Sequence, residues 1–144
     1  MPRWLTETEQ KAWRTLIGST YRLLARLDHE LQSEHGLSLR EYEVLAMLSE
    51  SPDRRRRMAD LACSLHVSPS GMTRRVDGLV RRGLVERAVC PEDRRGSLAV
   101  LTDDGMALVR RAAPTHVRGV REHLIDRLSE RQLANLAAAL ERID

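Results

Sequence analysis

The chain has 144 residues, a hydrophobic share of 42%, a charged share of 31% and a formal net charge of +3 at pH 7. This length fits one domain, or one compact subunit with two lobes, and the apolar share is enough for a core. A membrane span and a signal peptide are disfavoured, because no run of about 18 apolar residues occurs and the first residues lack an apolar stretch.

Two long helices are predicted in the first third of the chain. Residues 6–9 have the pattern of a capping box, and Gly36 is expected to end the helix that begins there. A second capping box at residues 38–41 predicts a helix that stops near Ser51, and residues 53–57 are predicted to form a charged loop. The apolar residues of the first helix recur at helical spacing: Trp13, Leu16, Ile17, Leu24, Leu27 and Leu31.

A helix-turn-helix pattern follows. A short helix from about Met58 to Leu65 precedes a turn and a second helix, in which Ser68 is the N-cap, Pro69 takes the first position and Gly83 ends the helix. Winding this helix at 100° per residue separates two faces. The residues expected to face the core are Met72, Val76, Leu79 and Val80. The opposite face carries Ser70, Arg74, Asp77, Gly78 and Arg81, with Gly71 and Arg75 at its flanks.

This segment also concentrates the positive charge. Residues 54–95 contain 11 arginines and five acidic residues, whereas the rest of the chain is net negative. A basic excess over a helix-turn-helix pattern is typical of nucleic-acid binding, although a solvated charged face is the alternative. Lys11 is the only lysine, and arginine's planar fork suits phosphates, guanines and narrow minor grooves.

A β-hairpin is predicted next, with strands at residues 84–89 and 97–102. Its connection carries Arg94 and Arg95 beside Gly96, at a tip that would protrude from the fold. An arginine on a stiff ribbon can enter the minor groove, where the negative potential is strongest over narrow A-tracts. Asp93 would repel phosphate, so we expect it to form an ion pair that fixes the direction of an arginine.

The C-terminal part is predicted to be helical. Thr102 is expected to cap a helix that Pro114 kinks without ending, because the apolar spacing resumes beyond the proline. A third capping box at residues 129–132 opens the last helix, whose apolar residues are Leu133, Leu136, Leu140 and Ile143. The predicted fold is therefore mainly α with a small β-hairpin wing, a winged helix-turn-helix with a helical dimerisation lobe.

These residues resemble the multiple-antibiotic-resistance regulator (MarR) family of bacterial winged-helix repressors. Residues 93–102 match the family's wing pattern of Asp, any residue, Arg and then Leu-Thr, and residues 68–85 look like its recognition helix and exit. The resemblance covers the whole chain in element order. One departure is Arg56-Arg57, where the family commonly has a Thr or Ser cap.

The resemblance implies an obligate homodimer, in which Arg95 probes the minor groove and Asp93 braces it. Residues 1–37 and 103–144 would form the dimerisation lobe, and residues 38–102 the DNA-binding lobe. Dimerisation is also expected because the terminal helices carry more apolar surface than one small subunit needs.

We predict a sequence-specific transcriptional regulator without enzymatic activity, most simply a ligand-responsive repressor that binds a pseudo-palindromic operator in double-stranded DNA. No catalytic triad, phosphate-binding glycine loop or paired-carboxylate cleft stands out. The predicted DNA-contacting residues are Ser68, Ser70, Gly71, Thr73, Arg74, Arg75, Arg81, Asp93, Arg94 and Arg95.

Regulators of the resembled family often bind small aromatic or phenolic acids between the two lobes. Aromatic residues of the first two helices could line such a cleft, with core or interface filling as the alternative: Trp13, Tyr21, His35 and Tyr42.

Two alternative functions are a winged-helix protein-interaction module and a redox-responsive regulator. Redox control would use Cys90, which neighbouring wing arginines could activate, whereas Cys63 is expected in the core. The spacing of the cysteines matches no disulfide or metal motif, and no two of the five histidines are four residues apart. We therefore expect no metal and no cofactor, and a place in the reducing, nucleoid-containing cytoplasm.

Overall fold

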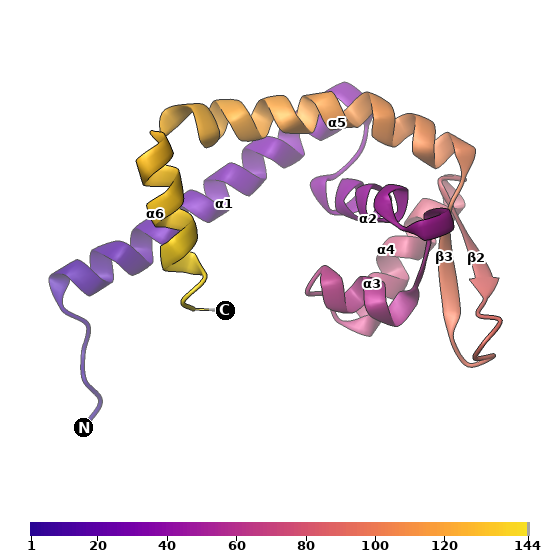
Figure 1. The fold of residues 1–144 in the computed structure, drawn as a ribbon, viewed down its shortest axis with the longest axis horizontal. Coiled ribbons are helices and arrows are strands. Elements are labelled where there is room, and N and C mark those ends of the chain that lie inside the picture. Colours follow the sequence, from indigo (N-terminus) through magenta and orange to yellow (C-terminus); the bar gives the residue numbers. More distant parts are fainter. Residues whose placement is uncertain (144) are drawn as a thin grey trace.

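The computed structural model describes residues 1–143 and is mainly helical, with one small antiparallel sheet (Figure 1), which confirms the predicted fold class. The α-helices are α1 (Glu7–His35), α2 (Leu39–Glu50), α3 (Met58–Ser64), α4 (Pro69–Arg81), α5 (Asp103–His123) and α6 (Glu130–Leu140). The strands are β1 (Arg55–Arg57), β2 (Val85–Val89) and β3 (Ser97–Leu101). Two short 3-10 helices are η1 (Pro52–Arg54) and η2 (Ile125–Arg127).

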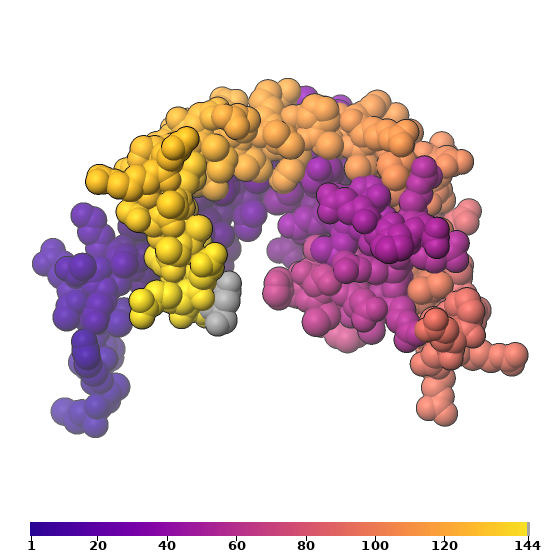
Figure 2. Space-filling model, in the orientation of Figure 1, coloured from indigo at the N-terminus to yellow at the C-terminus, as the bar shows by residue number. Residues whose placement is uncertain are grey.

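The long helices α1 and α5 form an arch. At one end, α2, α3, α4 and the sheet cluster beneath α5, and at the other end α6 turns down from the end of α5 and crosses in front of α1 in this view (Figure 1). The space-filling view shows an open gap between α6 and the α2–α4 cluster (Figure 2). The single chain is therefore bow-shaped, with its two ends of different construction.

The predicted helix starts are confirmed by hydrogen bonds at the caps. Thr6, Ser38 and Ser129 each take part in a complete capping box, and the side chain of Thr102 accepts from the backbone N–H of Gly105. Helix α5 continues through Pro114, as expected. These signals predicted the bounds well because each cap depends only on residues three positions apart.

The sheet differs from the prediction by one strand. Residues 55–57 pair antiparallel with β3, opposite Leu98 to Val100, and the strand order is β1-β3-β2. The predicted charged loop over residues 53–57 is therefore wrong for its last three positions. A run of arginines carries no apolar alternation, so its pairing with β3, more than 40 residues away, has no local signal.

The core lies where the end of α1, the α2–α4 cluster, the sheet and the start of α5 meet. Its largest fully buried side chains are Leu31, Leu37, Leu45, Leu48, Leu61, Met72, Leu79, Val44, Val76 and Val85. Val80 was expected to face this core, but it is 37% exposed, since it lies at the edge of the apolar face of α4. Gly105 packs so closely that a Cβ there would lie 2.2 Å from the carbonyl oxygen of Leu84. The start of α5 is thereby held against the segment between α4 and β2.

Candidate nucleic-acid interface

The turn between α3 and α4 fixes how α4 begins. His66 has a positive φ of 53°, and the hydroxyl of Ser68 accepts from the backbone N–H of Gly71 at 3.1 Å. A Cβ on Gly71 would lie 3.0 Å from both the Ser68 hydroxyl and a methyl of Val67. Glycine at position 71 thus allows the tight cap at the start of α4.

One face of α4 is exposed along its length. Ser70, Thr73, Arg74 and Arg81 all lie in solvent, on the face predicted to approach the major groove. Asp77, on the same face, forms an ion pair with Arg87 of β2, with a nitrogen–oxygen distance of 3.0 Å. This pair ties the exposed face of α4 to the hairpin.

Arg75 does not belong to that face. Its side chain is only 11% exposed, and one guanidinium nitrogen lies 3.9 Å from the carboxylate of Glu43 on α2. Burial and the nearby charge of Arg40 lower the pKa of Arg75, against the opposite effect of Glu43. Arg75 was predicted to contact DNA, but its position at the flank of the helix turns it toward α2.

The hairpin β2–β3 and its connecting loop, residues 90–96, are called the wing. The backbone N–H of Gly96 donates to the carbonyl of Asp93 at 3.0 Å, which closes a turn with Arg94 and Arg95 at its tip. The Asp93 carboxylate accepts from the backbone N–H of Arg95 at 3.0 Å, and it forms no ion pair among the described residues. The expected brace therefore acts on the backbone of Arg95, because the tight turn places that N–H two residues away.

The 11 arginines of residues 54–95 fall into two groups. Five pair with a carboxylate: Arg54, Arg57, Arg75, Arg82 and Arg87. Within residues 1–143, the other six have no carboxylate oxygen within 4.0 Å: Arg55, Arg56, Arg74, Arg81, Arg94 and Arg95. Unpaired guanidinium groups are the ones free to neutralise phosphates or to contact base edges. We call Ser70, Thr73, Arg74, Arg81, Arg94 and Arg95 the basic surface.

The paired arginines position the basic surface, which the sequence did not indicate. Arg57 of β1 pairs with Glu92 in the wing loop at 2.9 Å. Arg82, at the end of α4, donates to the carbonyl of Gly36 at 3.0 Å and to the carboxylate of Glu41 at 3.2 Å. These contacts join residues 35 to 46 positions apart, so no local pattern could predict them.

The sequence and the fold of this chain have known counterparts. The sequence model of the MarR family matches residues 35–96. AbsC, a MarR family transcriptional regulator from Streptomyces coelicolor, is 43% identical in sequence, and the match covers 99% of this chain and 95% of that one with a TM-score of 0.94. The chain belongs to the MarR family.

Two further relatives match most of the chain. Sco3205, a MarR family transcriptional regulator from Streptomyces coelicolor crystallised in complex with DNA, is 40% identical, with a TM-score of 0.95 over 99% of this chain and 89% of that one. The HTH-type transcriptional regulator PecS of Dickeya dadantii is 33% identical over 139 residues, 90% of this chain and 80% of PecS. The predicted family resemblance is confirmed.

The two cysteines of this MarR-family chain are placed opposite to expectation. Cys90 is 3% exposed, held under the wing turn, where its backbone N–H donates to the carbonyl of Gly96 at 3.1 Å. Cys63, expected in the core, is exposed. A redox sensor needs an accessible thiolate, so the burial of Cys90 removes the basis for the proposed redox control.

The four aromatic residues predicted to line an effector cleft do not meet within one chain. Trp13 and Tyr21 are exposed on α1, and 22 residues separate Trp13 from His35, which is about 33 Å along a helix. His35 and Tyr42 do converge on α5: His35 lies 2.8 Å from the hydroxyl of Thr115, and the Tyr42 ring stacks on His116 at 4.7 Å. Tyr42 is buried, as the alternative of core filling expects.

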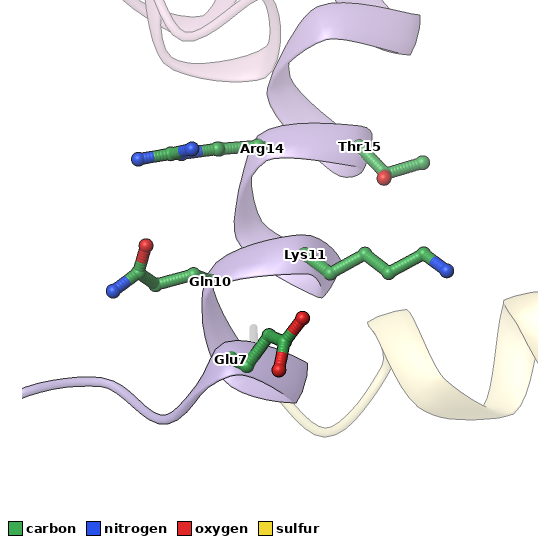
Figure 3. Close-up of a pocket in the computed structure, with 5 residues that line it drawn as sticks. All are labelled: Glu7, Gln10, Lys11, Arg14 and Thr15. Atoms are coloured by element: carbon green, nitrogen blue, oxygen red, sulfur yellow. The ribbon is translucent and has the colours of Figure 1, made fainter.

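A hollow of about 320 Å³ on the first turns of α1 is lined by five exposed residues of that one helix, with Gln10 and Arg14 extending to one side and Lys11 and Thr15 to the other (Figure 3). Residues 1–143 contain no group of three or more His, Cys, Asp or Glu placed to hold a metal ion. No helix in the described part of the chain is long and apolar enough to span a membrane.

Proposed function

We propose that this chain is a DNA-binding transcriptional regulator that reads its operator through the basic surface. The observation that carries the proposal is the presence, in a MarR-family fold, of exposed arginines on both α4 and the wing that have no carboxylate oxygen within 4.0 Å among residues 1–143. A helix and a β-ribbon held together by the pair Arg87–Asp77 suit adjacent grooves of one duplex. We favour repression as the output. A relative that is 27% identical, the HTH-type transcriptional repressor YetL of Bacillus subtilis, is named as a repressor.

In the proposed complex, α4 and the wing have different tasks. Ser70, Thr73 and Arg74 lie in the N-terminal half of α4, the part of a recognition helix that approaches base edges in the major groove. Arg94 and Arg95 would follow the backbone into the neighbouring minor groove. Ser68 and Gly71 would contribute mainly by fixing the start of α4, and Asp93 by fixing the wing turn.

We further propose that the regulator acts as a two-fold homodimer. Helix α6 has no buried residue, although its apolar side chains Leu136 and Leu140 follow helical spacing. An 11-residue helix is not stable in water without a packed face, so a second copy would have to cover it. Residues 1–37 and 103–144 would then form the dimerisation lobe, and the symmetric pair of winged lobes at residues 38–102 would bind two half-sites about one DNA turn apart.

The wing is tested by Arg95→Ala. The operator is first obtained by selecting bound duplexes from a random pool, and affinity is then measured by fluorescence anisotropy. We expect a loss of about 10- to 100-fold, because a desolvated guanidinium contact is worth about 1–3 kcal/mol. The control is Arg110→Ala, which removes an exposed arginine from α5 and should change operator affinity by no more than about twofold. Unchanged affinity of Arg95→Ala would rule out the wing assignment.

The role of α4 is tested by Arg74→Ala. If Arg74 contacts a base, the substitution should cost about 1–3 kcal/mol and relax the preference at one operator position. Repeating the selection with the variant measures that preference directly. A uniform loss on all sequences, together with a smaller salt dependence, would assign Arg74 to phosphate contact alone.

A small aromatic or phenolic effector remains part of the proposal. Its best support is the convergence of His35 and Tyr42 on neighbouring residues of α5, where helices of both proposed lobes meet. Trp13 and Tyr21 could take part only from a second subunit or at another site. If salicylate quenches the tryptophan fluorescence in a saturable manner and Trp13→Phe loses this quenching, the effector binds next to Trp13.

A further inference from the structure

A second basic site lies at the end of the arch away from the wing. A hollow of about 150 Å³ separates the middle of α1 from the end of α5 and η2. Its lining contains three arginines, a histidine, a serine and one apolar residue, and it contains no carboxylate: Ser19, Arg22, Leu23, Arg26, His123 and Arg127.

The three guanidinium groups have no acidic partner. Within residues 1–143, Arg22, Arg26 and Arg127 have no carboxylate oxygen within 4.0 Å; Arg22 donates only to the hydroxyl of Ser19, and Arg127 only to the carbonyl of Glu122. Three acids on α1 and η2 pair with other basic side chains, one of them with His123 in the wall of the hollow. Glu34 pairs with Arg118, Asp126 with Arg121 and Glu30 with His123. Three like charges therefore share one hollow.

His123 forms part of the wall of the hollow. Its side chain is 12% exposed; Nε2 lies 2.5 Å from Glu30, whereas Nδ1 is buried and has no hydrogen-bond partner. Glu30 is held against α5 because residue 119 is glycine: a Cβ there would lie 2.4 Å from the Glu30 carboxylate. The contact with Glu30 thereby fixes the orientation of the His123 ring in the wall of the hollow.

We propose that this hollow binds a small polyvalent anion, either a phosphate or a multicarboxylate. Planar guanidinium forks match both groups in geometry and charge, and a bound anion would relieve the repulsion among the three arginines. Contacts to Arg22 and Arg26 on α1 and to Arg127 on η2 would join two segments about 100 residues apart. The anion would thereby stabilise the packing of α1 against α5.

A second copy of the chain is a poorer occupant. The exposed apolar residues Trp13 and Leu24, which a partner subunit is expected to cover, lie roughly 140–180° around α1 from Arg22 and Arg26 at 100° per residue. The arginines therefore point away from that surface.

The test compares thermal unfolding of the full chain in sodium phosphate, sodium citrate and sodium chloride at equal ionic strength. At about ten times the dissociation constant, a bound anion should raise Tm by about 3–6 °C over chloride. A rise with phosphate alone identifies a phosphate site, and a rise with citrate alone or with both identifies a site that accepts carboxylates. Titration calorimetry should give one anion per chain.

Two double variants locate the effect. Arg22→Ala/Arg26→Ala should abolish the Tm difference between anions, whereas Arg94→Ala/Arg95→Ala, which removes two arginines from the wing, should retain it. Equal Tm in all three salts, or a difference that survives in Arg22→Ala/Arg26→Ala, would overturn the proposal. Conversion of a dimer to a monomer by Arg22→Ala/Arg26→Ala, seen by light scattering, would also overturn it and assign the hollow to a second copy. None of these measurements depends on DNA binding.

Discussion

The two ends of the arch differ in the kind of side chain that they expose to solvent. At the winged end, apolar residues of α2, α3, α4 and the sheet are buried together, and the exposed arginines Arg74, Arg81, Arg94 and Arg95 have no carboxylate partner among residues 1–143. At the other end, α6 has no buried residue, and large apolar side chains are exposed on it, on α1 and next to both helices. They are Trp4 and Leu5 before α1, Trp13, Tyr21 and Leu24 on α1, Leu136 and Leu140 on α6, and Ile143 after α6.

This difference separates two requirements within one small chain. The winged end has a packed apolar core and an exposed basic surface. Such a surface suits a partner that carries negative charge. The helical end leaves large apolar side chains of α1 and α6 exposed, and such side chains are the kind that a protein interface covers. Changes at one end should therefore affect assembly, and changes at the other end DNA contact alone.

The largest expected effect comes from breaking the helical end. Leu136→Asp/Leu140→Asp places two carboxylates on the apolar face of α6 and should convert the dimer to a monomer in light scattering. Loss of the second half-site removes its avidity, so operator affinity should fall by about 100-fold or more. Val89→Asp is the matched control, because Val89 is 67% exposed on the wing and the change should leave the mass unchanged. A dimer that survives the α6 variant would contradict the assignment.

A smaller effect should distinguish two neighbouring arginines at the end of α4. Arg82 is bound to Gly36 and Glu41, so Arg82→Ala should lower stability by about 1 kcal/mol and shift α4 without changing the salt dependence of DNA binding. Arg81 is exposed and unpaired, so Arg81→Ala should leave stability unchanged and reduce the salt slope by about one.

Chemical denaturation and anisotropy at several salt concentrations measure both quantities for this pair. If Arg82→Ala reduces the salt slope as Arg81→Ala does, Arg82 contacts phosphate and does not position the helix.

The features predictable from sequence were those encoded within a few residues. The capping residues Thr6, Ser38, Ser68 and Ser129 gave the helix starts, and the alternation around Gly96 gave the hairpin. The α4 face was also predictable in outline, because helical periodicity alone places Arg74 and Arg81 away from Met72.

Features that depend on distant partners were missed or misplaced. Strand β1 exists through its pairing with β3, Arg75 turns inward because α2 offers Glu43, and Cys90 is covered by the fold of its own turn. The exposure of Cys63 could not be predicted because a seven-residue helix defines its inner face poorly. Residue type and spacing therefore located the basic surface but not the contacts that orient it.

The smallest effect is expected at the junction of the two ends, where His116 of α5 stacks on Tyr42 of α2. Burial lowers the pKa of His116, partly offset by Glu43, so the folded chain binds this proton less readily than the unfolded chain does. The resulting stability is fully present above the ordinary histidine pKa of about 6.5 and is lost as pH falls below it. The pKa of Glu34 is also lowered, chiefly by the hydrogen bond that Thr115 donates to it. Protonation of Glu34 changes the stability only below pH 4.5, the ordinary pKa of this group. Tm should therefore decline between pH 6.5 and 5 in the native chain and decline less in His116→Gln, and parallel curves would show that the junction is not sensitive to this proton.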